Sequence, residues 1–171
     1  GFPTSPEIVY GFGASVGYKN FDLSCFFQGL GRESFWVDAE QVTPFALGKS
    51  GDQTTKNQLL KVIADDYWSE NNQNQYALWP RLSPSVNPNN TQQSTWFMRN
   101  GAFLRLKNVE IGYTLSKRLT ERIKMSKVRV YLNGTNLYCW SNFKLWDVEM
   151  AGDGLGYPVQ TVTNIGAQIS F

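Results

Sequence analysis

The chain has 171 residues and a net charge of only +2, and no run of Lys or Arg forms a basic patch, so a nucleic-acid partner is not indicated. It contains no histidine, which excludes histidine-based catalysis and histidine-ligated zinc. No uninterrupted apolar stretch reaches the length of a membrane-spanning helix, whereas a transmembrane β-barrel needs only alternate apolar residues and stays open.

Two antiparallel strands joined by a tight turn are predicted over residues 7–19 and 20–31. In both segments large apolar side chains alternate with small or polar ones, which is the two-residue period of a β-strand with one apolar face. Lys19 and Asn20 form the turn between them. The glycines opposite the large residues favour a crowded or water-filled barrel lumen over the interior of a soluble sandwich.

The alternation fails between residues 32 and 100, where Asn, Gln, Ser and Pro are frequent. A loop of this length is uncommon in a compact domain and is usually functional where it occurs. Within it, residues 54–68 carry apolar side chains at helical spacing. They predict one short amphipathic helix that packs the loop against itself.

Two more strands are predicted over residues 101–115 and 127–139. In the first of them the apolar positions change parity near Lys107 and Asn108, which predicts a β-bulge at that point. Residues 116–126, between these strands, are expected to form a short polar turn with some helical character.

A fifth strand is predicted over residues 159–171, after a second irregular segment over residues 140–158. From Thr163 to Phe171 apolar and polar residues alternate strictly. A tilted strand needs about 9–11 residues to cross a bilayer, so this segment is long enough. The links between the five strands are alternately short and long, which is the plan of an outer-membrane barrel with short periplasmic turns.

Several stretches resemble motifs of the SusC/RagA family of TonB-dependent transporters. Residues 101–115, GAFLRLKNVEIGYTL, resemble the family's FLRLKNV-x-LGYTLP signature, and VRVYLNGTNL at 128–137 resembles its next strand. WSENN at 68–72 and WPRL at 79–82 resemble the family's W-x-x-ENP … YPRL element. DVE at 147–149 and GYP at 156–158 resemble its DPE … YP loop. The final IGAQISF resembles the family's terminal LGLNLTF. The motifs stand in family order and cover nearly the whole chain.

Three positions depart from those motifs. Asn72, Ser116 and Val148 stand where the family usually has proline. Because proline fixes the backbone angle φ, these changes affect the local turn geometry but not the overall resemblance.

The resemblance implies an all-β fold in which the chain supplies the last five antiparallel strands of a transmembrane β-barrel of about 22 strands. It makes loops 32–100 and 140–158 extracellular and turn 116–126 periplasmic, and it places the plug and the N-terminal barrel strands outside this chain. It also implies that Phe171 is the recognition signal for the barrel-assembly machinery.

The resemblance further implies active import across the outer membrane of a Bacteroidetes-type bacterium. Such transporters take up oligosaccharides or peptides together with a SusD-like surface lipoprotein, and TonB supplies the energy through the plug. We therefore expect no enzymatic activity and no cofactor. The expected partners are the remainder of the barrel and plug, the lipoprotein, TonB, the barrel-assembly machinery and the lipid bilayer, with no nucleic acid.

We expect oligosaccharides as the substrate, with peptides as the alternative within the family. Outside the family, a passive porin would explain the strands, and a secreted β-sandwich acting as a carbohydrate-binding module would explain both the strands and the tryptophans. An enzyme is the least supported reading, because no nucleophile–base or carboxylate pair stands in a recognisable frame.

Two sets of side chains are candidates for functional contacts. Four loop tryptophans are candidates to stack on sugar rings, although packing of the loops or an interfacial aromatic girdle is the simpler explanation for any single one: Trp36, Trp68, Trp79 and Trp146. The residues expected to face lipid are Phe12, Val16, Leu23, Phe27, Val109, Ile111, Val130, Ile165 and Ile169.

No metal site is predicted. Asp147, Glu149 and Asp153 lie close in sequence but lack the regular ligand spacing of a calcium loop, so a solvated acidic loop is the expected structure. Glu110 is expected to form an ion pair with Lys107 or Arg105 on the lumen side.

Overall fold

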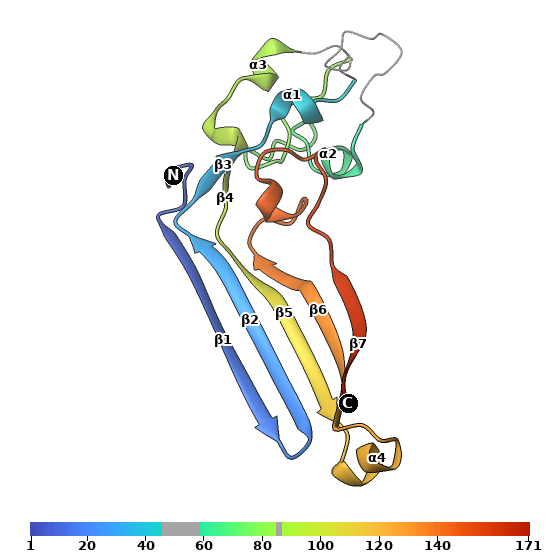
Figure 1. The fold of residues 1–171 in the computed structure, drawn as a ribbon. Coiled ribbons are helices and arrows are strands. Elements are labelled where there is room, and N and C mark those ends of the chain that lie inside the picture. Colours follow the sequence, from blue (N-terminus) through green and yellow to red (C-terminus); the bar gives the residue numbers. More distant parts are fainter. Residues whose placement is uncertain (46–58, 85–86) are drawn as a thin grey trace. The chain divides into compact units, whose positions relative to one another are not determined.

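The structure is a computed structural model that describes residues 1–45, 59–84 and 87–171 (Figure 1). The chain divides into two compact units. The sheet unit consists of Pro6–Arg32, Ala102–Asn142 and Val159–Phe171, and the loop unit consists of the described residues of Gly1–Ser5, Glu33–Gly101 and Phe143–Pro158.

The sheet unit is one antiparallel sheet with the strand order β1-β2-β5-β6-β7 (Figure 1). Its strands are β1 (Ile8–Tyr18), β2 (Phe21–Gly31), β5 (Phe103–Thr114), β6 (Lys127–Ser141) and β7 (Val162–Ser170). Each begins and ends within about three residues of its predicted bounds, which is close to the uncertainty of any strand boundary. The prediction of five antiparallel strands is confirmed.

The sheet has one apolar face and one polar face. Residues opposite each other in register point to the same side of a sheet, so the row of Val16, Leu23 and Ile111 lies on one face, which we call the apolar face. Asp22 and Gly112, the next pair of residues in register, lie on the opposite face of the sheet, which we call the polar face. The alternation read from the sequence is therefore kept across all five strands.

The predicted β-bulge is present on β5. The register between β2 and β5 shifts between Phe26 and Phe27. Lys107 of β5 lies opposite no residue of β2 at that point. The register between β5 and β6 shifts at the same place, and Asn136 of β6 has a φ of 54° nearby. The extra residue explains the parity change in the sequence, because it returns apolar side chains to the same face.

The turn between β5 and β6 contains a short helix, α4 (Lys117–Arg122). It ends with two hydrogen bonds, from Met125 N to Thr120 O and from Lys124 N to Glu121 O. With Lys124 at a φ of 56°, these bonds form the Schellman arrangement that closes many helices.

The loop unit has secondary structure that the sequence did not predict. Its elements are β3 (Ser34–Trp36), α1 (Ala39–Val42), α2 (Lys61–Asp65), α3 (Pro88–Thr91), the 3-10 helices η1 (Thr95–Phe97) and η2 (Val148–Met150), and β4 (Met98–Asn100). β3 and β4 pair as a two-stranded antiparallel sheet. Of the helix predicted over 54–68, α2 forms only the five residues Lys61–Asp65, and residues 54–58 lie outside the described residues.

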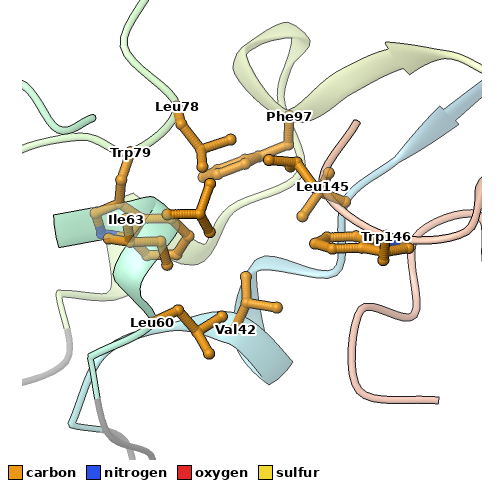
Figure 2. A pocket seen from close by; sticks show the side chains of 10 residues that line it. Val42, Leu60, Ile63, Leu78, Trp79, Phe97, Leu145 and Trp146 are labelled. Atoms are coloured by element: carbon orange, nitrogen blue, oxygen red, sulfur yellow. The ribbon is translucent and has the colours of Figure 1, made fainter. Parts of the chain in front are cut away.

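A filled apolar core holds the loop unit together (Figure 2). Ile63, Trp79 and Phe97 expose only 2 to 3% of their surface, and the rings of Trp79 and Phe97 lie 5.4 Å apart. The space left among them is about 10 Å³, which is at the lower limit of what one water molecule occupies. This apolar centre is therefore packing and has no room for a ligand.

None of the helices in the described ranges is long and apolar enough to span a membrane.

Candidate functional site

A polar cleft of about 380 Å³ opens in the loop unit. Its volume falls within the usual range of ligand pockets, about 300–1,000 Å³. It is lined by Trp36, Val37, Asp38, Ala39 and Glu40 from one segment and by Thr91, Gln92 and Gln93 from another. We call it the Trp36 cleft.

The first wall of the Trp36 cleft is the turn from β3 into α1. Backbone N–H groups of Val37 and Asp38 donate to the carbonyls of Phe97 and Gly152, each at 2.9 Å. The Asp38 carboxylate accepts a hydrogen bond from the Gln41 N–H at 3.2 Å and caps α1. Backbone hydrogen bonds thus hold the turn from two sides, and Trp36 and Glu40 flank the capping residue Asp38.

The second wall begins at α3. The Asn87 side chain accepts from the Asn89 N–H at 3.0 Å and caps this helix, and Pro88 occupies its first position, where the missing N–H costs nothing. The Asn90 side chain donates to the Arg81 carbonyl at 3.1 Å. This anchoring leaves the exposed amides of the next two residues, 92 and 93, at the cleft.

Only one of the four predicted tryptophans lines this cleft. Trp36 does so, half-buried. Trp79 exposes 3% of its surface, so it offers no ring face and the predicted sugar-stacking role does not fit it. Trp146 lines the apolar core beside it, with its Nε1 donating to the Ala151 carbonyl at 2.9 Å (Figure 2). Trp68 is half-buried and lies outside the cleft lining.

The acidic and amide residues of the cleft were not predicted from the sequence. One signal was available, because Asp38 followed three residues later by Gln41 matches the capping-box pattern of a helix start. Gln92 and Gln93 carry no such signal, since their position depends on the anchoring of α3.

The acidic segment over 147–153 does not gather its carboxylates around one point. An oxygen of Asp147 accepts the Glu149 N–H at 3.0 Å and starts η2, and one of Asp153 accepts the Leu155 N–H at 3.3 Å. The part of the chain that the structure describes has no group of three or more His, Cys, Asp and Glu side chains placed to hold a metal ion. These carboxylates shape turns.

On the polar face of the sheet, one guanidinium joins three strands. Arg129 of β6 donates from Nε to Asp22 Oδ1 at 3.0 Å, and its Nη2 lies 2.7 Å from Glu110 Oε1. Glu110 was expected to pair with Lys107 or Arg105, but its partner here comes from the neighbouring strand. The Arg129 side chain exposes 14% of its surface, and the Tyr131 ring lies 5.2 Å from it.

Large side chains on the polar face lie over glycines of the adjacent strand. Phe26 covers Gly11 and Gly13, where an added Cβ would come within 3.0 and 3.2 Å of its ring. Tyr131 covers Gly166 so closely that an added Cβ would overlap the end of its ring. The face is therefore crowded, which agrees with the interpretation of these glycines from the sequence.

The nine residues expected to face lipid share the apolar face. The register of all four strand pairs places them on the same side, and several are widely exposed, Ile165 by 80% and Val16 by 62%. That they contact lipid remains a prediction.

Aromatic residues mark both ends of the apolar face. Tyr138 and Trp140 pack at 4.7 Å near one end, and Phe21 and Tyr113 pack at 4.7 Å at the other. Trp140 is opposite Leu104 and Phe21 is opposite Tyr113, so the two groups are about 30 Å apart along β5 at about 3.3 Å per residue. With a strand tilt of about 40°, this spacing is about 23 Å across a membrane, close to the usual apolar band of about 25 Å.

Comparison with curated proteins finds two TonB-dependent receptors of Formosa agariphila. TonB-dependent receptor P26 is 26% identical over 190 residues, covering 97% of this chain, and receptor P3 is 29% identical over 149 residues, covering 87%. The chain spans only 17% and 13% of the length of these relatives. A comparison with protein-family profiles finds no match.

Solved structures of a peptide importer share the fold. The RagAB peptide transporter aligns with a TM-score of 0.70 at 25% identity, over 98% of this chain and 18% of the other. The closed-closed state of the RagAB peptide importer gives 0.69 at 25%, and the open-open state gives 0.65 at 23%.

Neither comparison supports a secreted β-sandwich. The relatives are receptors and transporters, not enzymes. The sheet unit is thus five strands of a large transmembrane β-barrel, in a class of proteins of the outer membrane. Over nearly its whole length the chain is similar to TonB-dependent receptors and to the RagAB transporter, and it spans less than a fifth of either.

Proposed function

We propose that the chain is part of an active importer that takes up oligosaccharides across the outer membrane. A SusD-like surface lipoprotein captures the substrate with it, and TonB energises transport. The pairing with a lipoprotein is supported by the likeness to RagAB, and the energy source by the likeness to TonB-dependent receptors. The five strands supply barrel wall, and the loop unit supplies part of the substrate vestibule.

The residues that line the Trp36 cleft are the reason for proposing oligosaccharides as the substrate. An indole ring presents a flat apolar surface to the C–H face of a sugar ring, while carboxylates and amides form hydrogen bonds with its hydroxyls. Trp36, Asp38, Glu40, Gln92 and Gln93 provide this combination around one cavity. Among the described residues none that lines the cleft is a cation, so this part of the cleft offers no charged partner to the C-terminal carboxylate of a peptide.

Peptides are the second candidate. The solved structures of similar fold are described as a peptide importer, and two of them are 25% identical to this chain. The carboxylates of the Trp36 cleft would then meet the α-amino group of a peptide.

The test uses the full-length transporter, incubated with a mixture of oligosaccharides of three to eight units and, separately, with a tryptic digest of casein. Mass spectrometry identifies what is retained, and calorimetry measures the affinity of the retained species. We expect retained oligosaccharides and a loss of about tenfold in affinity for Trp36→Ala, because an aromatic contact contributes about 1–2 kcal/mol. Trp68→Ala, which removes a loop tryptophan outside the cleft, is the control and should leave the affinity unchanged.

Retention of peptides alone would establish the second candidate. Retention of oligosaccharides with equal affinity in wild type and Trp36→Ala would remove the cleft from the binding site.

We also propose that segments 32–100 and 140–158 are extracellular and that turn 116–126 is periplasmic. In support, the two long segments fold into one unit, with the rings of Phe35 and Phe143 in edge contact at 5.1 Å. In whole cells, and in a background without the native cysteines, Tyr76→Cys should react with an impermeant maleimide. Lys117→Cys should react only after the outer membrane is permeabilised. The reverse pattern would invert this topology.

A further inference from the structure

A basic surface forms at the turn end of the sheet unit. Residues 116–127 contain five of the chain's 16 Lys and Arg residues and only one of its 14 Asp and Glu residues, Glu121. These cations and the one in the β1–β2 turn are all solvent-exposed. We call this set the basic turn surface: Lys19, Lys117, Arg118, Arg122, Lys124 and Lys127.

The antiparallel register brings the two turns to the same end of the sheet (Figure 1). The carbonyl of Asn20, in the first turn, accepts the N–H of Thr114 at 2.8 Å, just before α4. On the other side of α4, the Ser126 N–H donates to the Ser170 carbonyl at 2.8 Å. The sheet thus adds Lys19, about a hundred residues away in sequence, to the five cations that residues 116–127 already hold.

The helix α4 adds exposed apolar side chains to this surface. Thr120 is buried, at 2% exposure, whereas Leu119 of the helix and its C-cap residue Ile123 are 48% and 51% exposed. These two residues are four apart, the spacing at which side chains of a helix share a face. Cations and two aliphatic side chains therefore reach solvent together, as in helices that lie at a membrane interface.

The basic turn surface lies directly beyond the aromatic residues that end the apolar face. Tyr18, 70% exposed, precedes Lys19, and Phe21 follows the same turn and packs on Tyr113. In a transmembrane barrel, aromatic residues of this kind lie at the level of the lipid headgroups. The next groups outward are then at the depth of the headgroup phosphates.

Two of the cations occupy backbone positions that usually favour glycine. Lys19 has a φ of 55° and Lys124 a φ of 56°, in the left-handed region that L-residues adopt at some cost. At Lys124 the position is the one where glycine most often ends a helix. The turn geometry alone therefore does not account for lysine at either place.

We propose that the basic turn surface binds the phosphate headgroups of anionic glycerophospholipids, with Leu119 and Ile123 at the boundary of the acyl chains. Clusters of this size on a short amphipathic helix are attracted to anionic bilayers, by up to about fivefold in affinity for each cation near the surface. The placement of this surface at the inner leaflet depends on the topology proposed above. The contact is independent of the imported substrate.

The test uses the full-length transporter in phosphatidylcholine bilayers with trace spin-labelled phosphatidylglycerol or phosphatidylcholine. Electron spin resonance measures which labelled lipid is held at the protein surface. We expect wild-type protein to prefer phosphatidylglycerol severalfold in 0.1 M salt. The preference should largely vanish in 1 M salt, where the screening length falls from about 10 Å to about 3 Å.

The triple substitution Lys117→Gln, Arg118→Gln and Arg122→Gln should reduce the preference at least threefold, and Arg118→Gln alone should reduce it by less. The matched control removes three cations of the loop unit, by Lys61→Gln, Arg81→Gln and Lys144→Gln, and should leave it unchanged. Substrate affinity should be the same in the wild type and the α4 variants, which separates this contact from the import function.

Three results would overturn the proposal: no preference in wild-type protein, an equal preference in the wild type and the α4 variants, or an equal loss in the loop control. Binding of purified peptidoglycan that depends on the α4 cations, without any lipid preference, would replace the lipid by that polymer. Barrel assembly is checked for each variant by its heat-modifiable mobility on gels.

Discussion

Replacing Ile63 by alanine should unfold the loop unit locally while the sheet unit stays intact. Ile63 is the most deeply buried large side chain among the described residues, at 2% exposure, and lies in the apolar core shown in Figure 2. Truncation of a buried isoleucine to alanine costs about 2–5 kcal/mol, and the existing void of about 10 Å³ gives the neighbours little freedom to collapse. The better helix propensity of alanine returns only about 0.4 kcal/mol. A net loss of about 3 kcal/mol is therefore expected.

Hydrogen exchange of the full-length protein measures this effect. A loss of about 3 kcal/mol corresponds to exchange about 100-fold faster in residues 59–84, whereas exchange in β5 should not change. Val62→Ala is the matched control, because the neighbouring side chain in α2 is 37% exposed and its truncation should cost less than about 1 kcal/mol. Equal acceleration in β5 and in the loop unit, or none in either, would refute the view that the loop unit has its own core.

Three further predictions concern single positions. Gly166→Ala should lower the stability of the assembled barrel by about 1–3 kcal/mol, because the added Cβ overlaps the Tyr131 ring. Gly17→Ala is the control and should not lower it, because the nearest atom to the added Cβ is 3.9 Å away. Equal melting temperatures for the two variants would contradict this prediction. Gly152→Ala should displace the turn from β3 into α1, because the added Cβ overlaps a backbone carbonyl of β3. Calorimetry should then detect no ligand binding at the Trp36 cleft. An unchanged affinity would show that the turn adapts to the added Cβ. Burial raises the pKa of the Glu33 carboxyl, so its contribution to the stability of the loop unit is present at low pH and lost as pH rises through the raised pKa. Glu33→Gln should remove that part of the pH dependence of hydrogen exchange, and an unchanged slope would argue against it.

The two faces of the sheet differ in the way that a barrel wall requires. On the polar face, large side chains lie over glycines of the next strand, and one arginine forms ion pairs with two carboxylates. On the apolar face, branched and aromatic side chains remain exposed and end in aromatic residues at both edges. Neither arrangement requires the Trp36 cleft, which belongs to the loop unit.

The strands could be predicted from the sequence because their pattern is local. A strand of 9 to 15 residues repeats the apolar–polar alternation often enough to be recognised, and even the bulge at Lys107 left a visible change of parity. The side of the sheet on which Val16, Leu23 and Ile111 lie follows from the same alternation. The motifs around residues 101–115 and 128–137 then indicated the family.

The loop unit could not be predicted in the same way. Its strands have three residues and its helices three to five, which is too short for a period to appear, and their stability comes from contacts such as Trp79 with Phe97. Whether a tryptophan is a core residue or lines a cleft depends on those contacts. For this reason the sequence assigned one role to Trp36, Trp79 and Trp146, and only the tertiary structure separated them.

The basic turn surface depends in part on the tertiary structure. Five of its cations are close together in sequence, whereas only the register of the sheet brings Lys19 to the same end. The sequence by itself determined the strands, their two faces and the resemblance to TonB-dependent transporters. The tertiary structure decided which tryptophan lines a cleft, which cation pairs with Glu110, and that Lys19 lies at the same end of the sheet as the cations of residues 116–127. Each of these depends on contacts between residues far apart in the chain.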